Sequence, residues 1–153
     1  MKTTISLFLF LIFSSSAFAQ WTLTNGVGTA NGNTIYTVGN DIFAGTDSKA
    51  YRTTNNGDSW IEINDGFGPS RKIRDFAYSN LTSTLWCAAE NSGLYFSTNN
   101  GTNWIREYSS FTTSPIAVAT ANQYVIMSRS NYIYSTTNNG VNWVTMDGND
   151  PSS

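Results

Sequence analysis

A short segment occurs three times along the chain, and this repeat limits what the sequence can fold into more than any other feature. The three copies begin at Tyr51, Tyr95 and Tyr134, so their starts are 44 and 39 residues apart. Each copy places Ser or Thr two positions after its tyrosine, Asn four positions after it, Gly six and Trp nine. A repeat of this length indicates an array of similar structural units that stack on one another.

Each copy predicts a β-hairpin. An Asn-Gly pair stands between two runs of alternating apolar residues, and this dipeptide accepts the positive φ angles that a tight turn needs. The preceding asparagine can bond nearby backbone N–H groups as an Asx-turn, and the tryptophan begins the return strand with a large apolar surface. We expect the repeated residues to be structural: Thr53, Asn55, Gly57, Trp60, Ser97, Asn99, Gly101, Trp104, Thr136, Asn138, Gly140 and Trp143.

Two further strand-like runs precede each hairpin. They cover residues 34–38 and 41–45 in the less regular first copy, 73–78 and 85–89 in the second, and 116–119 and 124–128 in the third. About four short strands in roughly 40 residues is the size of one propeller blade, and no segment has a helical periodicity long enough to compete. The sequence predicts an all-β fold, a β-propeller of four-stranded antiparallel blades, with about three blades at residues 29–66, 67–110 and 111–149.

Residues 21–25 resemble the outer strand of the first copy, which begins at Trp60. We expect them to form the outer strand of a closing blade whose other strands are not adjacent in sequence. Propellers usually close with about four to eight blades, and three blades leave unpaired strand edges. The ring is therefore expected to be incomplete, or to be completed by a second copy of the chain in a homo-oligomer.

The first 19 residues follow the plan of a secretory signal peptide. Lys2 precedes an apolar run at residues 5–13, and Ala17 and Ala19 supply the small residues of a cleavage site before Gln20. The apolar run is about half of the roughly 20 residues that a membrane-spanning helix needs, so a retained anchor is the weaker interpretation. We expect a secreted or cell-surface protein of residues 20–153 with no stable membrane span.

Composition excludes several kinds of site. The chain has no histidine, which excludes a His-based triad and a His-ligated zinc. Cys87 is the only cysteine, so there is no intrachain disulfide and no CxxC metal or redox site, and its apolar surroundings predict a buried thiol. A net charge of −2 with 12% charged residues gives no electrostatic footprint for nucleic acid. We expect no metal, no cofactor and no nucleic-acid partner.

The repeated hairpin resembles the Asp-box, or BNR, repeat, which reads Ser/Thr, any, Asp, any, Gly, any, Thr/Ser/Asn, Trp. This chain departs from it at one position, because Asn replaces Asp in all three copies. The mature chain is thereby similar to secreted propeller proteins related to photosystem II stability and assembly factors, sortilin-type receptors, sialidases and xyloglucan-cleaving glycosidases. In those families the box stabilises the hairpin between the third and fourth strands, away from the ligand-binding face.

The resemblance covers both enzymes and binding proteins, and a fold alone does not choose between them. The Phe/Tyr-Arg-Ile-Pro signature of sialidases is absent, and Arg52 and Arg106 fall on outer hairpin strands. A glycosidase of the xyloglucan-cleaving type would need two carboxylates facing each other across a cleft. The loops expected on the ligand-binding face supply Asp47, Asp65, Asp75 and Glu90 as scattered acids.

The densest charge lies between the first and second copies, at Arg71, Lys72 and Arg74 beside Asp75. These residues are weak candidates for an anion-binding patch on the ligand face, and the simpler interpretation is a solvated loop. No convergent catalytic set is found. We expect an exported, non-catalytic propeller module that binds protein or glycan or takes part in surface assembly. The alternative is a fragment of a larger secreted BNR-repeat glycoside hydrolase.

Overall fold

The computed structural model describes residues 26–28, 30–68, 72–107 and 114–146. Within these ranges the chain forms twelve β-strands and no helix, which confirms the predicted all-β fold. The predicted leader at residues 1–19 and the predicted outer strand at residues 21–25 lie outside the described residues.

The strands form three antiparallel four-stranded sheets, and in each sheet they are hydrogen-bonded in chain order. We refer to these sheets as blades 1 to 3. Blade 1 contains β1 (Gly32–Val38), β2 (Asp41–Thr46), β3 (Ala50–Thr53) and β4 (Ile61–Glu62). Blade 2 contains β5 (Lys72–Ser79), β6 (Thr84–Glu90), β7 (Gly93–Ser97) and β8 (Ile105–Arg106). Blade 3 contains β9 (Ala117–Ala121), β10 (Tyr124–Arg129), β11 (Tyr132–Thr136) and β12 (Val144–Thr145).

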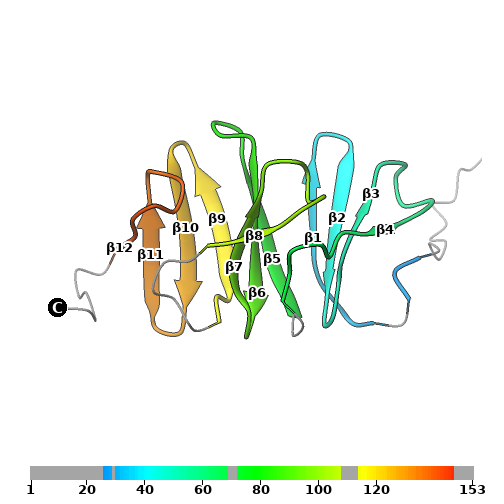
Figure 1. Ribbon diagram of the computed structural model, residues 1–153, viewed down its shortest axis with the longest axis horizontal. Helices are drawn as coiled ribbons and strands as arrows, with labels where there is room; N and C mark the ends of the chain where they lie inside the picture. The colour runs from blue at the N-terminus through cyan, green and yellow to red at the C-terminus, as the bar shows by residue number, and fades with distance from the viewer. Residues whose placement is uncertain (1–25, 29, 69–71, 108–113, 147–153) are drawn as a thin grey trace, which may run out of the picture.

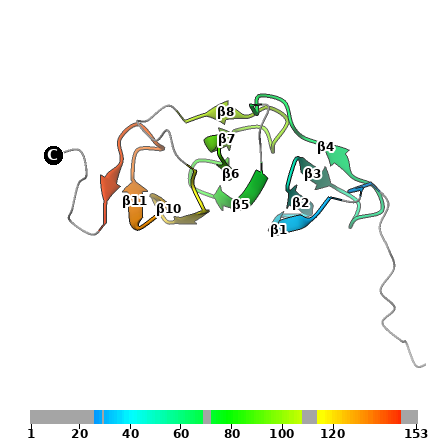
Figure 2. The ribbon, with the colours of Figure 1, turned by 90° about the horizontal axis from the view of Figure 1, so that it is seen from below.

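The three blades stand side by side in chain order (Figure 1). The first strands of the blades are neighbours, because β1 contacts β5 and β5 contacts β9. The short fourth strands β4 and β8 lie on the opposite side of the row (Figure 2). The blades therefore fan outward from an inner row of first strands, as in a propeller, and the described blades form an open ring.

Neighbouring blades pack through large apolar side chains. At the first junction, Phe76 of blade 2 lies against Phe43 of blade 1, with ring centroids 6.0 Å apart. At the second junction, Trp143 of blade 3 meets Trp86 of blade 2 edge-on, with centroids 6.4 Å apart. Burial of one such side chain contributes about 1.5–3 kcal/mol. These junctions therefore supply much of the core that single four-stranded sheets lack.

One apolar face of blade 3 stays open. The strand register places Phe43, Trp86 and Ile126 at the same position of blades 1, 2 and 3. The following blade buries Phe43 and Trp86 completely, whereas Ile126 is only partly buried and the nearby Ile133 is 48% exposed. An apolar cavity of about 240 Å³ lies on this face, and Ala119 belongs to its lining. In the described part of the chain, no blade covers this surface.

Gly26 and Gly66 lie against the tryptophans of two repeated hairpins. Gly66, which follows β4, lies so close to the backbone of Trp104 that a Cβ atom would overlap it. Gly26 lies less closely against Trp60, and a Cβ atom there would lie 3.2 Å from the Trp60 Cβ. Both glycines have positive φ, 124° at Gly26 and 90° at Gly66. Each of these two glycines therefore packs against the tryptophan of a repeated hairpin.

Candidate functional site

The Ser or Thr hydroxyl group two positions after each repeat's tyrosine is the centre of the hydrogen bonds in its hairpin. In blade 2, Ser97 Oγ donates to Asn99 Oδ1 at 2.8 Å and accepts the backbone N–H groups of Asn99 at 3.3 Å and Gly101 at 2.9 Å. Asn99 Oδ1 also accepts the N–H of Asn103 at 3.0 Å. The same contacts join the matching residues of the other two hairpins: Thr53, Asn55, Gly57 and Ser59, and Thr136, Asn138, Gly140 and Asn142.

The turns adopt the backbone that the Asn-Gly pairs favour. Asn56, Asn100 and Asn139 have φ angles of 57°, 53° and 57°, and the glycines that follow them also have positive φ. Asn is one of the few residues with a side chain that visits this region routinely. The second turn has an additional anchor, because Arg52 of blade 1 donates from Nη1 to the Asn100 carbonyl oxygen at 2.9 Å.

Trp104 and Trp143, two of the three repeated tryptophans, lie at blade junctions. Trp104 is buried, stacks on Phe67 with centroids 4.9 Å apart, and donates its indole N–H to the Ile63 carbonyl oxygen at 2.9 Å. The equivalent Nε1 of Trp60 is buried and has no acceptor among the described residues. The hairpin residues thus act within and between blades.

A row of polar side chains crosses one end of the inner strands, and we call it the loop-end strip. It consists of Asn31, Asn33, Asp47, Lys72, Arg74, Glu90, Asn91 and Ser114. Its members come from the starts of β1 and β5, from the ends of β2 and β6 with the turns that follow, and from the segment before β9. The strip therefore exists only because consecutive blades place these segments next to one another.

Asp47 is the most strongly bonded member of the loop-end strip. Lys72 Nζ lies 2.9 Å from its Oδ1, while Asn31 and Asn33 donate to its two oxygens at 3.0 and 3.1 Å. The Lys72 contact, followed by the two asparagine contacts, lowers the pKa of Asp47 from 3.8 to about 2. These bonds stabilise the carboxylate, so Asp47 is ionised at neutral pH.

The other acids of the predicted ligand face also have structural partners. Glu90 pairs with Arg74 at 2.8 Å, and Asp65 accepts a hydrogen bond from Asn103 of the next blade. Asp75 accepts the N–H of Phe76 at 2.9 Å and the N–H of Val118 in blade 3 at 3.1 Å, and so joins two blades.

The structure describes two of the three candidate anion-binding residues. Arg71 lies outside the described residues. Lys72 and Arg74 are paired with Asp47 and Glu90. The interpretation of Lys72 and Arg74 as part of a loop is wrong, because both residues belong to β5. This strand contains a bulge between Ile73 and Asp75. The bulge re-aims neighbouring side chains at the strand's end.

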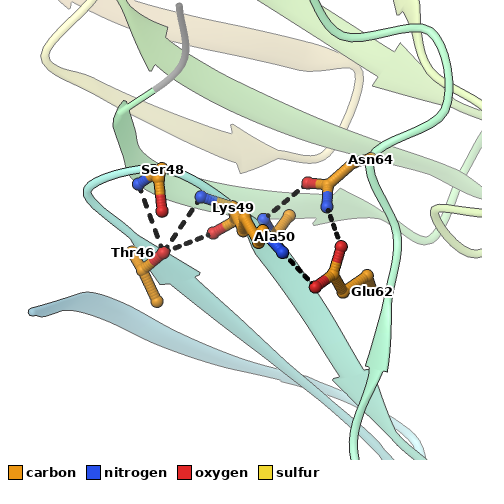
Figure 3. A network of polar contacts seen from close by, with 6 residues as sticks. All are labelled: Thr46, Ser48, Lys49, Ala50, Glu62 and Asn64. Atoms are coloured by element: carbon orange, nitrogen blue, oxygen red, sulfur yellow. Dashed lines mark hydrogen bonds and ion pairs between the residues drawn. The ribbon is translucent and has the colours of Figure 1, made fainter. Parts of the chain in front are cut away.

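The turn after β2 is tied to the outer strand of its own blade (Figure 3). Thr46 Oγ1 accepts the N–H of Lys49 at 3.0 Å and donates to its carbonyl oxygen at 2.9 Å. Lys49 also pairs with Glu62 of β4, and the N–H of Ala50 donates to Asn64 Oδ1 at 3.0 Å. The bonds of Thr46 to the Lys49 backbone hold the turn that carries Asp47.

Sequence reasoning missed the uncharged polar members of the loop-end strip. Asn91 and Ser114 come from different blades, and the Asn91 N–H donates to Ser114 Oγ at 2.7 Å. An open cavity of about 530 Å³ at the opposite end of the strands was missed too. Residues of the β5–β6 and β9–β10 turns line it, among them Asn80, Asn122 and Gln123. Asparagines in turns are too common in this chain to have singled these out.

Other site classes find no support in the described part of the chain. Cys87 is fully buried, and desolvation, followed by the charge of Asp75, raises the pKa of its thiol well above 9.0, so it is a poor nucleophile. Among the described residues, no group of three or more acids or cysteines is placed to hold a metal ion. The described ranges also contain no helix able to cross a membrane.

No family model and no curated protein matches the chain. Solved structures do resemble it. YCF48 bound to D1 peptide superposes with a TM-score of 0.64 at 17% identity, over 77% of this chain and 40% of that one. YCF48 from Cyanidioschyzon merolae gives 0.57 at 20% identity, over 70% and 33%. An ancestral GH74 enzyme gives 0.62 at 19% identity, over 79% and 19%.

This chain therefore spans well under half the length of the propellers that it resembles. The neighbours include both a peptide-bound protein and an enzyme. At these identities the likeness shows the fold and leaves open whether this chain is an enzyme. The three sheets and the structural neighbours together identify the described chain as three blades of a β-propeller.

Proposed function

We propose that this chain is an exported, non-catalytic module of Asp-box repeats that binds an extended segment of another protein along the loop-end strip. One observation carries the proposal: the strip combines amide side chains with ion pairs that neutralise each other. The pairs Lys72–Asp47 and Arg74–Glu90 leave little net charge, while Asn31 and nearby amides supply donors and acceptors. Such a surface suits the N–H and C=O groups of an extended peptide. The peptide bound to YCF48 supports this choice of ligand.

The state of the carboxylates supports a binding role over hydrolysis. A glycosidase needs one acid that is protonated at the working pH and a second carboxylate opposite it. The pKa of Asp47 is shifted the opposite way, because its contacts lower it to about 2. Glu90 is held by Arg74, and Asp75 is held by two backbone N–H groups.

Peptide binding is tested with the full chain on an array of overlapping, unstructured peptides, with Lys72→Ala against Lys49→Ala. Lys49 is a matched control, because it pairs with Glu62 on the outer strand of blade 1 rather than with the strip. We expect binding that Lys72→Ala weakens and Lys49→Ala does not change. An array without binding, or equal losses in both variants, would overturn the role of the strip.

The second candidate is a part of a larger glycoside hydrolase, and the likeness to the ancestral GH74 enzyme over 79% of this chain supports it. Incubation with xyloglucan separates the two candidates. Release of reducing ends that is lost in Glu90→Gln or Asp75→Asn would favour the hydrolase. N-terminal sequencing of the secreted protein tests export, since the proposal expects Gln20 as the first residue.

Ring completion by a second copy is part of this proposal, and the open apolar face of blade 3 supports it. Ile133 and Met146 on this face are 48% and 58% exposed. However, β12 already fills the fourth position of blade 3, so a partner's N-terminal strand would compete with it. Light scattering of the wild type and of Ile133→Asp tests this. We expect an oligomer that the variant dissociates, and a monomeric wild type would contradict it.

A further inference from the structure

Each of the three turns contains a dipeptide that reacts with itself. In an Asn-Gly pair, the glycine backbone nitrogen loses its proton and attacks Cγ of the asparagine side chain. A C–N bond forms, ammonia leaves, and the product is a five-membered succinimide ring. Water then opens the ring to aspartate or to isoaspartate, in which the main chain runs through the former side chain. The pairs in this chain are Asn56-Gly57, Asn100-Gly101 and Asn139-Gly140.

In all three turns, the attacking nitrogen is already engaged. The N–H groups of Gly57, Gly101 and Gly140 donate to the hydroxyl groups of Thr53, Ser97 and Thr136 at 3.0, 2.9 and 3.1 Å. These three glycines are buried, although the asparagines before them are exposed. The proton that must leave is therefore held in a hydrogen bond that water does not reach.

The hydroxyl group is a poor base in this position, because all its bonding capacity is used. A serine or threonine hydroxyl has one donor and two acceptor sites. Ser97 Oγ donates to Asn99 and accepts from the N–H groups of Asn99 and Gly101. It therefore holds the glycine N–H without being free to remove the proton.

Backbone geometry adds a second barrier. The reacting asparagines have φ between 53° and 57°, which is the left-handed region, and this region restricts ψ to a narrow range. Ring closure requires the side-chain Cγ to swing onto the next nitrogen, so the turn must leave this conformation. In the second turn, Arg52 also holds the Asn100 carbonyl oxygen at 2.9 Å.

We infer that the hydroxyl residue that begins each box protects its Asn-Gly turn from deamidation. Asn56, Asn100 and Asn139 are thus spontaneous modification sites that react only when their own hairpin opens. The product adds a negative charge, and isoaspartate lengthens the main chain within a tight turn, so an opened hairpin that reacts does not close again. Local opening would then become an irreversible loss of the blade.

The test uses the full-length chain and follows each turn separately by peptide mass spectrometry during incubation at 37 °C and mildly alkaline pH. The variants are Ser97→Ala and the conservative Ser97→Thr, which places in blade 2 the residue found in blades 1 and 3. In Ser97→Ala we expect deamidation of Asn100 to accelerate about tenfold, which corresponds to about 1.4 kcal/mol for the lost hydrogen bond. Ser97→Thr should keep the wild-type rate.

The other two turns are internal controls in the same molecule. Asn56 and Asn139 should keep their wild-type rates in Ser97→Ala, and a parallel rise at all three sites would assign the effect to global unfolding and overturn the inference. An unchanged rate at Asn100 would also overturn it. If Ser97→Ala does not fold, Thr136→Ala makes the same test at Asn139. Wild type in guanidinium chloride gives the unprotected rate, and equal native and denatured rates would contradict any protection.

Discussion

Trp104 of blade 2 donates its indole N–H to the carbonyl oxygen of Ile63 in blade 1 at 2.9 Å. This bond crosses the junction between two blades and lies among Phe43, Phe67 and Phe76. A residue that belongs to the hairpin motif of one blade therefore completes the core of the preceding blade. The repeat that defines the hairpins also defines how the blades stack.

We expect Trp104→Phe to lower the free energy of unfolding by about 1–3 kcal/mol, because it leaves the buried Ile63 carbonyl oxygen without this donor. Trp60→Phe is the matched control, since the Trp60 Nε1 has no acceptor among the described residues. Urea unfolding monitored by circular dichroism provides the comparison. Equal losses in the two variants would mean that ring size, and not the hydrogen bond, determines the cost.

Gly66→Ala tests the close approach between blades. Gly66 has a φ of 90°, and a Cβ atom there would overlap the carbonyl oxygen of Trp104. Gly39→Ala is the control, because Gly39 has a φ of 59° with no atom within 4 Å of an added Cβ. Both variants strain a left-handed backbone, but only Gly66→Ala must push two blades apart. We expect its unfolding free energy to fall by about 1–3 kcal/mol more than that of Gly39→Ala.

The contacts of the Asp47 carboxylate predict that the folded chain loses stability in acid. The pKa of Asp47 is about 2 in the folded chain, against 3.8 for the ordinary carboxyl group, because Lys72 and two asparagines stabilise the ionised form. The unfolded state therefore binds more protons between these two values, so this contribution is fully present above pH 3.8 and is lost as the pH falls towards 2. Denaturant midpoints measured across this range should fall less steeply in Asp47→Asn. Identical slopes would show that the Asp47 contacts do not contribute.

Turn chemistry explains why the hairpins could be predicted and the loop-end strip could not. Asn55 bonds residues within four positions of itself, so the amino-acid order nearly determines that contact. Asp47, in contrast, bonds Asn31, Asn33 and Lys72. The asparagine contacts depend on the pairing of β1 with β2, and the Lys72 contact depends on the packing of β5 against blade 1. Periodicity predicts the existence of those strands but not which loop ends they bring together.

In two of the three hairpins, the asparagine four positions after the repeat's tyrosine makes a bond that a carboxylate cannot make. Asn55 Nδ2 donates to Ser59 Oγ at 3.0 Å, and Asn99 Nδ2 donates to Asn103 Oδ1 at 3.1 Å. The two acceptors differ in one respect. The Ser59 hydroxyl can rotate and donate, whereas the Asn103 amide nitrogen already donates to Asp65.

We therefore expect Asn55→Asp to change the free energy of unfolding by less than about 0.5 kcal/mol, because Ser59 donates to the new carboxylate. Asn99→Asp should cost about 1–3 kcal/mol. Its carboxylate faces the Asn103 oxygen, and a flipped Asn103 amide would instead turn that oxygen towards Asp65. Urea unfolding at pH 7 measures both variants. Equal stability of the two variants would show that Asn103 satisfies both carboxylates, and asparagine would then have no energetic advantage over aspartate at this position.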